Sequence, residues 1–141
     1  SQNAWNHARG MATGHNYVMF NRYTQWTFDD VKFTAVKAEH SDNYAIGVII
    51  EAEGKTYYIT GDTLYNTEIF KDLPDNIDVV FLPVNGVGNN FNMTDAARFA
   101  KEIGAKKVVP VHFGLFDSLE PGKDFACDNK VIPSIYKEIE L

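Results

Sequence analysis

The sequence contains almost no cysteine and no long apolar run. Cys127 is the single cysteine among 141 residues, so an internal disulfide cannot form and a reducing compartment is favoured. No apolar stretch approaches the roughly 20 residues that span a bilayer, and the first residues lack a charged region followed by an apolar one. We therefore expect a cytoplasmic protein with no membrane partner.

Positive charge is also scarce. Thirteen Lys and Arg residues stand against nineteen Asp and Glu residues, which gives a formal net charge of -6. Nucleic-acid-binding proteins normally present a basic face to the phosphates, and the sequence shows no cluster of basic residues. We therefore expect no nucleic-acid partner.

What is present is typical of one globular domain. The hydrophobic content is 45% and the aromatic content 13%, which argues against disorder, and the length suits a single domain over residues 1–141. The chain begins with Ser1 rather than methionine. We interpret this as a sign of a fragment, a processed product or an expression product.

The pattern of apolar residues changes along the chain. Residues 1–26 have no clean period and predict loops, and β-rich runs bounded by turn residues predict strands afterwards. The second half alternates strands with helices, and Thr94 and Gly104 are the expected N-cap and C′ residues of its longest helix. The predicted strands are 17–22, 31–35, 44–52, 56–60, 77–82 and 107–113, and the predicted helices are 64–73, 94–104 and 132–141. This order predicts a layered α/β fold.

Three polar residues that ligate metals in proteins follow predicted strands. Asp62 ends the run Tyr58–Thr63, where a glycine allows a sharp turn and a carboxylate is able to bridge two cations. The simpler alternative is that Asp62 is a turn residue or a helix N-cap. His112 and His40 each come just after an apolar strand, where a neutral imidazole is available to a metal. For each histidine the alternative is a hydrogen-bonded side chain at the edge of the core.

Other features carry weaker signals. His7 and His15 are not spaced like a ligand pair, and Cys127 has no arrangement that indicates a nucleophile. The run Asn85–Asn90 is rich in glycine but lacks the Lys-Ser/Thr of a phosphate loop. It predicts a mobile loop beside a site at the end of the strand 77–82.

Taken in order, the three strand ends resemble a known family. Residues 28–41, the run ending in Gly61-Asp62-Thr63, and residues 78–116 with His112 resemble metallo-β-lactamase-fold hydrolases, most closely the L-ascorbate-6-phosphate lactonase-like branch. The resemblance implies the C-terminal half of an αββα sandwich with a mixed sheet. It also implies that His40 completes a first metal site, that Asp62 bridges two metals and that His112 binds the second.

The resemblance implies a mechanism for the parent protein. Two divalent ions, Zn or Mn and also Fe by ligand type, would lower the pKa of a bridging water toward about 7 and yield a metal-bound hydroxide. This hydroxide would hydrolyse a lactone, ester or phosphoester of a small molecule. The histidine ligands must be neutral, so activity is expected to fall in acid.

One part of the family pattern is missing. The signature His-x-His-x-Asp-His string occurs nowhere in the sequence. Three ligands shared over two sites fall short of the roughly four that each site needs. We expect this chain alone to bind metal weakly and to be inactive, and we assign no catalytic residue beyond the three ligands.

Three other interpretations stay open. The chain is a non-catalytic fragment or assembly module, which predicts exposed apolar surface and association, including homo-oligomers. It belongs instead to an RNA-processing nuclease of the same fold, which predicts a basic groove. Or it is a plain α/β domain in which the three polar residues coincide by chance.

Overall fold

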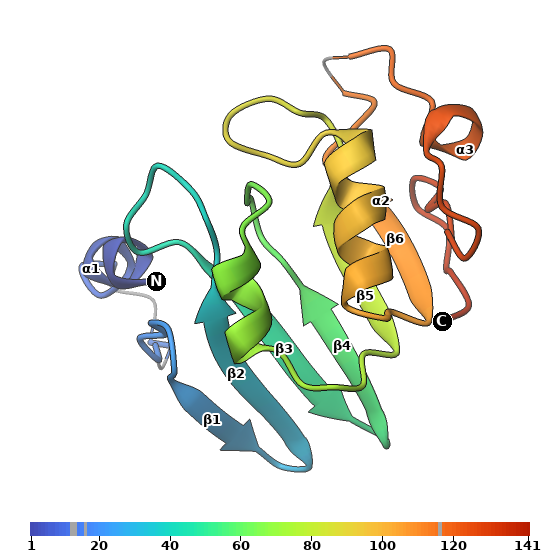
Figure 1. Cartoon of the computed structure of the whole chain (residues 1–141). Helices are drawn as coiled ribbons and strands as arrows, with labels where there is room; N and C mark the ends of the chain where they lie inside the picture. Colours follow the sequence, from blue (N-terminus) through green and yellow to red (C-terminus); the bar gives the residue numbers. More distant parts are fainter. Residues whose placement is uncertain (12–13, 16, 116) are drawn as a thin grey trace.

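A single mixed sheet organises the chain. The computed structural model describes residues 1–11, 14–15, 17–115 and 117–141. Within them, six strands lie in the order of the sequence (Figure 1). The three pairs of neighbours from β1 to β4 are antiparallel, and β4, β5 and β6 run parallel. The strands are β1 (Gln25–Phe28), β2 (Val31–Lys37), β3 (Ile46–Ala52), β4 (Lys55–Ile59), β5 (Val79–Pro83) and β6 (Lys107–Val111).

Turn chemistry connects the antiparallel strands as predicted. Asp29 and Asp30 form the turn between β1 and β2, and Asp29 has a φ of 49°. Glu53 and Gly54, both with positive φ, form the turn between β3 and β4. Aspartate and above all glycine adopt this left-handed backbone readily in tight turns. The hairpins therefore have short connections.

The prediction for the first 26 residues was partly wrong. The helix α1 (Gln2–Ala8) occupies part of the expected loop region, and the early strand lies at Gln25–Phe28 rather than at 17–22. Pairing with β2 decides this position, because Gln25 to Phe28 lie opposite Thr34 to Val31 in register. Residues 12–13 and 16 of the expected loop lie outside the described residues.

Two helical segments, both C-terminal to β4, pack on one face of the sheet (Figure 1). They are η1 (Thr67–Asp72), a 3-10 helix, and α2 (Met93–Glu102). The N-cap of α2 is Asn92, whose side chain accepts a hydrogen bond from the backbone N–H of Asp95, so the predicted cap at Thr94 was wrong by two residues. Gly104 follows the helix with a φ of 64°, as a C′ glycine does.

The C-terminal prediction was wrong. Residues 132–141 form turns and irregular structure rather than a helix, and a short helix α3 (Pro121–Asp124) lies in the preceding loop. The chain just before this segment pairs with β6: the N–H of Val108 donates to the carbonyl of Asn129, and the N–H of Val131 donates to the carbonyl of Val108. This pairing occupies the backbone of residues 129–131 immediately before the predicted helix.

The core lies between the sheet and the two helices. It contains Tyr58, Val80 and Val108, which share one face of adjacent strands, together with Phe99 of α2 and Ile69 of η1. The opposite face of the sheet is also apolar; Val79 and Val109 are buried there, whereas Ile59 keeps 42% of its surface in solvent. Among the described residues, none of the helices is long and apolar enough to cross a membrane.

Candidate metal centre

The sheet topology brings the three predicted ligands to one edge. The strands β2 and β4 are both antiparallel to β3 and therefore run in the same direction, and β5 and β6 run parallel to β4. The residues that follow these strands all emerge at the same end of the sheet (Figure 1). His40 follows β2, Asp62 follows β4 and His112 follows β6.

Asp62 and His112 lie side by side. The distance from Nε2 of His112 to Oδ2 of Asp62 is 3.8 Å, and about half of each side chain is exposed. Two ligand atoms in a tetrahedral site with bonds of about 2.1 Å stand about 3.4 Å apart. The pair therefore needs a shift of only a few tenths of an ångström to share one cation, and an imidazole with a carboxylate is a donor set that Zn and similar cations accept.

The His112 ring is held by a neighbouring strand end. His112 has a φ of 59°, a left-handed conformation that is uncommon outside glycine and that turns the chain sharply after β6. Nδ2 of Asn85, which follows β5, lies 2.7 Å from Nδ1 of His112. This contact leaves Nε2 facing Asp62. Because an amide N–H only donates, Nδ1 accepts this hydrogen bond and the neutral ring carries its proton on Nε2, so a metal bound at Nε2 would replace that proton.

His40 lies apart from this pair. The backbone N–H of Asp42 donates to Nδ1 of His40 at 3.2 Å, so Nε2 carries the proton and donates to the carbonyl of Gly88 at 3.0 Å. The segment Ser41–Asp42 therefore orients the ring. Within the described part of the chain, no group of three or more His, Cys, Asp or Glu side chains is close enough to hold a metal ion.

Gly61 explains how the chain reaches Asp62. Its φ is 65°, and an added Cβ would lie 2.7 Å from the carbonyl oxygen of Ile46, the first residue of β3. Only glycine allows β4 to turn across the end of β3 at this distance. Asp62 is not the N-cap of the next helix, because Asn66 caps η1 by accepting from the N–H of Glu68 at 2.8 Å. The helix-cap alternative for Asp62 is therefore excluded.

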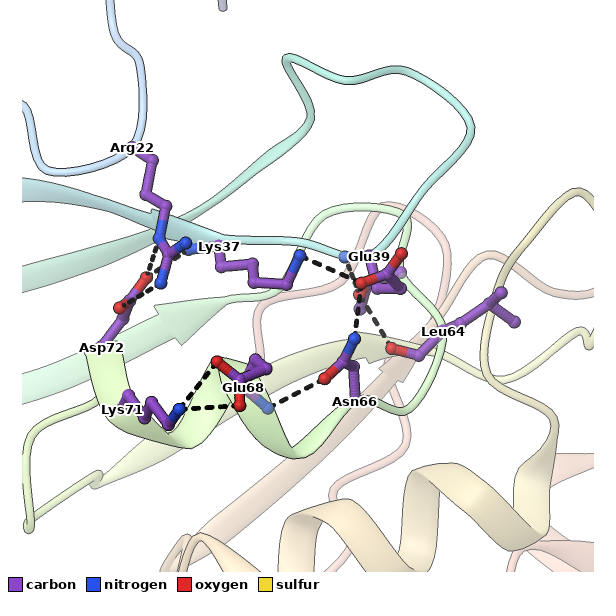
Figure 2. A network of polar contacts seen from close by, with 9 residues as sticks. Arg22, Lys37, Glu39, Leu64, Asn66, Glu68, Lys71 and Asp72 are labelled. Atoms are coloured by element: carbon purple, nitrogen blue, oxygen red, sulfur yellow. Dashed lines mark hydrogen bonds and ion pairs between the residues drawn. The ribbon is translucent and has the colours of Figure 1, made fainter.

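A polar network surrounds Glu39, the residue before His40 (Figure 2). Its carboxylate receives Nζ of Lys37 at 3.0 Å and Nδ2 of Asn66 at 2.6 Å. The hydrogen bonds from Lys37 and then from Asn66 hold the pKa of the Glu39 carboxyl below its ordinary value. Asn66 thus caps η1 with one end of its amide and binds Glu39 with the other.

A hollow opens beside the ligand pair. It has a volume of about 350 Å³ and is lined by Asn85, His112, Phe113, Leu115 and Asp117. Its walls are largely apolar apart from the amide, the imidazole and the carboxylate. A larger hollow of about 480 Å³ lies at the opposite end of α2, around Gly104 and Cys127, and contains none of the predicted ligands.

The sequence did not reveal the residues that support the ligands. Asn85 and Glu39 are polar residues within two positions of a strand end, and Gly88 contributes only a backbone carbonyl. The strand ends themselves were visible in the sequence. Which side chains meet across them depends on the order of strands in the sheet, which no local pattern contains.

Comparison with known proteins agrees with this architecture. A UPF0173 metal-dependent hydrolase from Anoxybacillus flavithermus is 36% identical over 114 residues, which cover 67% of this chain and 48% of the relative. A second one, from Ruegeria, is 31% identical over 159 aligned positions that cover 97% of this chain and 65% of the relative. A solved metallo-beta-lactamase fold protein from Bacillus subtilis has a TM-score of 0.70 at 20% identity and covers 92% of this chain and 58% of its own.

The family assignment follows from the extent of the match. The chain spans about half the length of the first of these relatives. The mixed α/β fold predicted from the order of elements is confirmed, since the solved structure shares it over most of the chain. Residues 3–113 match the family described as the beta-lactamase superfamily domain, and the chain belongs to that family.

Proposed function

We propose that this chain contributes Asp62, His112 and His40 to the metal centre of a metal-dependent hydrolase. The observation that carries the proposal is the convergence of three strand ends on one edge, where Asp62 and His112 stand 3.8 Å apart. Relatives that are named metal-dependent hydrolases support it. A cytoplasmic setting fits the single cysteine, because one cysteine forms no internal disulfide and proteins of reducing compartments rarely contain disulfides.

Each of the three residues has a distinct role in this proposal. A divalent cation, Zn or Mn and also Fe by ligand type, would act as a Lewis acid and lower the pKa of a water. Asp62 offers two oxygens and so suits a bridging position between two ions, while His112 offers Nε2 with its ring held by Asn85. His40 would join after Nε2 leaves the carbonyl of Gly88.

The hollow beside His112 is the proposed place for the substrate. Phe113 and Leu115 offer apolar surface, and Asn85 offers an amide for a carbonyl or hydroxyl group. We propose a small molecule with a lactone, ester or phosphoester bond, in line with the resemblance to the lactonase-like branch. The net charge of -6 disfavours an RNA substrate.

Metal titration tests the proposal. Zn²⁺ and Mn²⁺ binding to the chain would be measured by calorimetry, and Asp62→Ala and His112→Ala should each weaken binding by at least about tenfold because each removes one of few ligands. His7→Ala is the matched control, since His7 lies in α1 and outside the site. Equal affinity in the wild type, Asp62→Ala and His112→Ala would refute the ligand assignment.

The exposed sheet face supports a second candidate, a domain that works by association. Trp26, Phe33, Ile50 and Tyr57 lie opposite one another across four strands and make an apolar row that η1 and α2 do not cover. Large apolar patches usually mark interaction sites. Under this candidate the chain associates through the row and binds no metal, whereas the hydrolase proposal requires metal binding whether or not the chain associates.

A further inference from the structure

The loops that carry His40 and Asp62 are joined by hydrogen bonds that neither ligand makes. The backbone N–H of Glu39 donates to Oγ1 of Thr63 at 2.8 Å, and the N–H of Leu64 donates to the carbonyl of Glu39 at 2.8 Å. The Thr63 hydroxyl donates in turn to the carbonyl of Leu64 at 3.0 Å. We call this arrangement of Glu39, Thr63 and Leu64 the strand-end clasp.

The strand-end clasp spans two strands that do not touch. β3 lies between β2 and β4, so the ends of β2 and β4 are separated by about 10 Å of sheet. Gly61 lets the chain cross the first residue of β3, and Thr63 then meets Glu39 on the far side. The contact is long-range in sequence and closes the gap between the two candidate ligands.

Thr63 is fully buried, which makes its hydroxyl hard to replace. It has no exposed surface, so solvent cannot supply a partner for the Glu39 N–H if the hydroxyl is removed. Thr60 is a natural comparison, because it is equally buried but its hydroxyl donates to the carbonyl of its neighbour Gly61. The two threonines therefore differ in what they join rather than in burial.

The clasp is anchored to η1 as well (Figure 2). Asn66 donates to the Glu39 carboxylate while it caps η1, and Lys37 adds an ion pair from β2. Asp72, at the end of η1, accepts the backbone N–H of Lys37 at 2.9 Å. Contacts from β2 and η1 thus hold the residue before His40 in one place.

We propose that Thr63, through the strand-end clasp, is a positioning residue that sets the separation of His40 from Asp62. This inference rests on the proposed function, because a fixed separation matters for two ligands of one metal centre. Thr63 itself touches neither a metal nor a substrate. Its contribution is the spacing, which the metal needs before both ligands are able to bind.

The test uses three variants of the chain and Mn²⁺ as the probe. Thr63→Val keeps the shape and removes the hydroxyl, Thr63→Ser keeps the hydroxyl, and Thr60→Val removes a hydroxyl that lies outside the clasp. Two-dimensional NMR would record the paramagnetic broadening of residues 40, 62 and 112 during Mn²⁺ titration. Amide hydrogen exchange of Glu39 and Leu64 would report the clasp directly.

We expect Thr63→Val to lose broadening at residue 40, to bind Mn²⁺ at least roughly tenfold more weakly and to exchange the Glu39 amide faster. Thr63→Ser and Thr60→Val should resemble the wild type. Faster exchange in Thr63→Val with unchanged Mn²⁺ affinity and broadening would overturn the positioning role.

Failure of the proposed function would look different. If Mn²⁺ broadened none of the three residues in the wild type, the proposed metal centre would be refuted. The clasp would then be judged by exchange alone: fast exchange confined to Thr63→Val supports it as a loop connection, and equal exchange in all four proteins overturns it.

Discussion

Asp72 shows how a single side chain links segments far apart in the sequence. Its carboxylate accepts two hydrogen bonds from Arg22, at 2.6 and 2.8 Å, and one from the backbone of Lys37. Burial acts to raise the pKa of Asp72, and the bonds from Arg22 and Lys37 more than offset it, so the pKa lies below the ordinary 3.8. The charged form is therefore favoured by the fold.

This shift predicts acid sensitivity. A carboxyl with a lowered folded pKa stabilises the protein fully above its ordinary pKa, and the contribution is lost as the pH falls through the folded value. Asp72→Asn should lower the free energy of unfolding by about 1–2 kcal/mol at pH 7, after allowance for the part-exposed Arg22. The deficit relative to the wild type should shrink at pH below 3.8.

Urea denaturation at several pH values would measure this difference. Glu51→Gln is the control, because the Lys32–Glu51 pair is exposed on both sides and contributes little. A deficit for Asp72→Asn that is the same at every pH, or no larger than that of Glu51→Gln, would contradict the prediction.

At the scale of elements, the turn after β4 decides whether the site forms. Gly61 combines a positive φ with a close approach to the Ile46 carbonyl, whereas Gly54 in the β3–β4 turn has a positive φ of 73° and open space around it. Replacing each glycine with alanine therefore separates two contributions to the free energy of unfolding. One is the left-handed backbone, and the other is collision with a neighbouring strand.

We predict that Gly54→Ala lowers the free energy of unfolding by about 1 kcal/mol, the cost of the left-handed conformation. Gly61→Ala should lower it by about 3 kcal/mol or more, because the methyl group also meets backbone that cannot rotate away. Chemical denaturation of both variants would measure this. Equal losses would show that the approach to Ile46 relaxes without cost.

At the scale of the whole molecule, η1 and α2 cover one face of the sheet, and the other face leaves large apolar side chains exposed along β1 and β4. That face carries Phe28 and Ile59, which are 65% and 42% exposed, beside the row from Trp26 to Tyr57. An apolar face of this kind is suited to packing against a second apolar face.

We predict that the isolated chain self-associates through this face. The double variant Phe28→Lys with Ile59→Lys should shift it to monomer, since charges resist burial. Size-exclusion chromatography with light scattering would measure the mass. Tyr136→Lys is the control, because Tyr136 is fully exposed in the C-terminal segment and belongs to none of the strands that form the row. Association that survives the double variant, or disappears with the control, would contradict the prediction.

Local patterns in the sequence determined the strands, the turns and the positions that end them. The apolar runs before His40, Asp62 and His112 are strands, and the glycine before Asp62 forms the turn, because these depend on neighbouring residues. The predicted terminal helix over 132–141 was wrong: residues 129–131 pair beside β6, and the chain after them forms turns and irregular structure.

Only the tertiary structure decided which strand ends meet. The order of strands places Asp62 next to His112 and Asn85 on its ring, and it closes the clasp from Thr63 to Glu39 across β3. These contacts join residues 24 to 50 positions apart, so no periodicity or turn signal contains them. The sequence by itself therefore determined the three candidate ligands, and long-range packing decided what holds them and how close they lie.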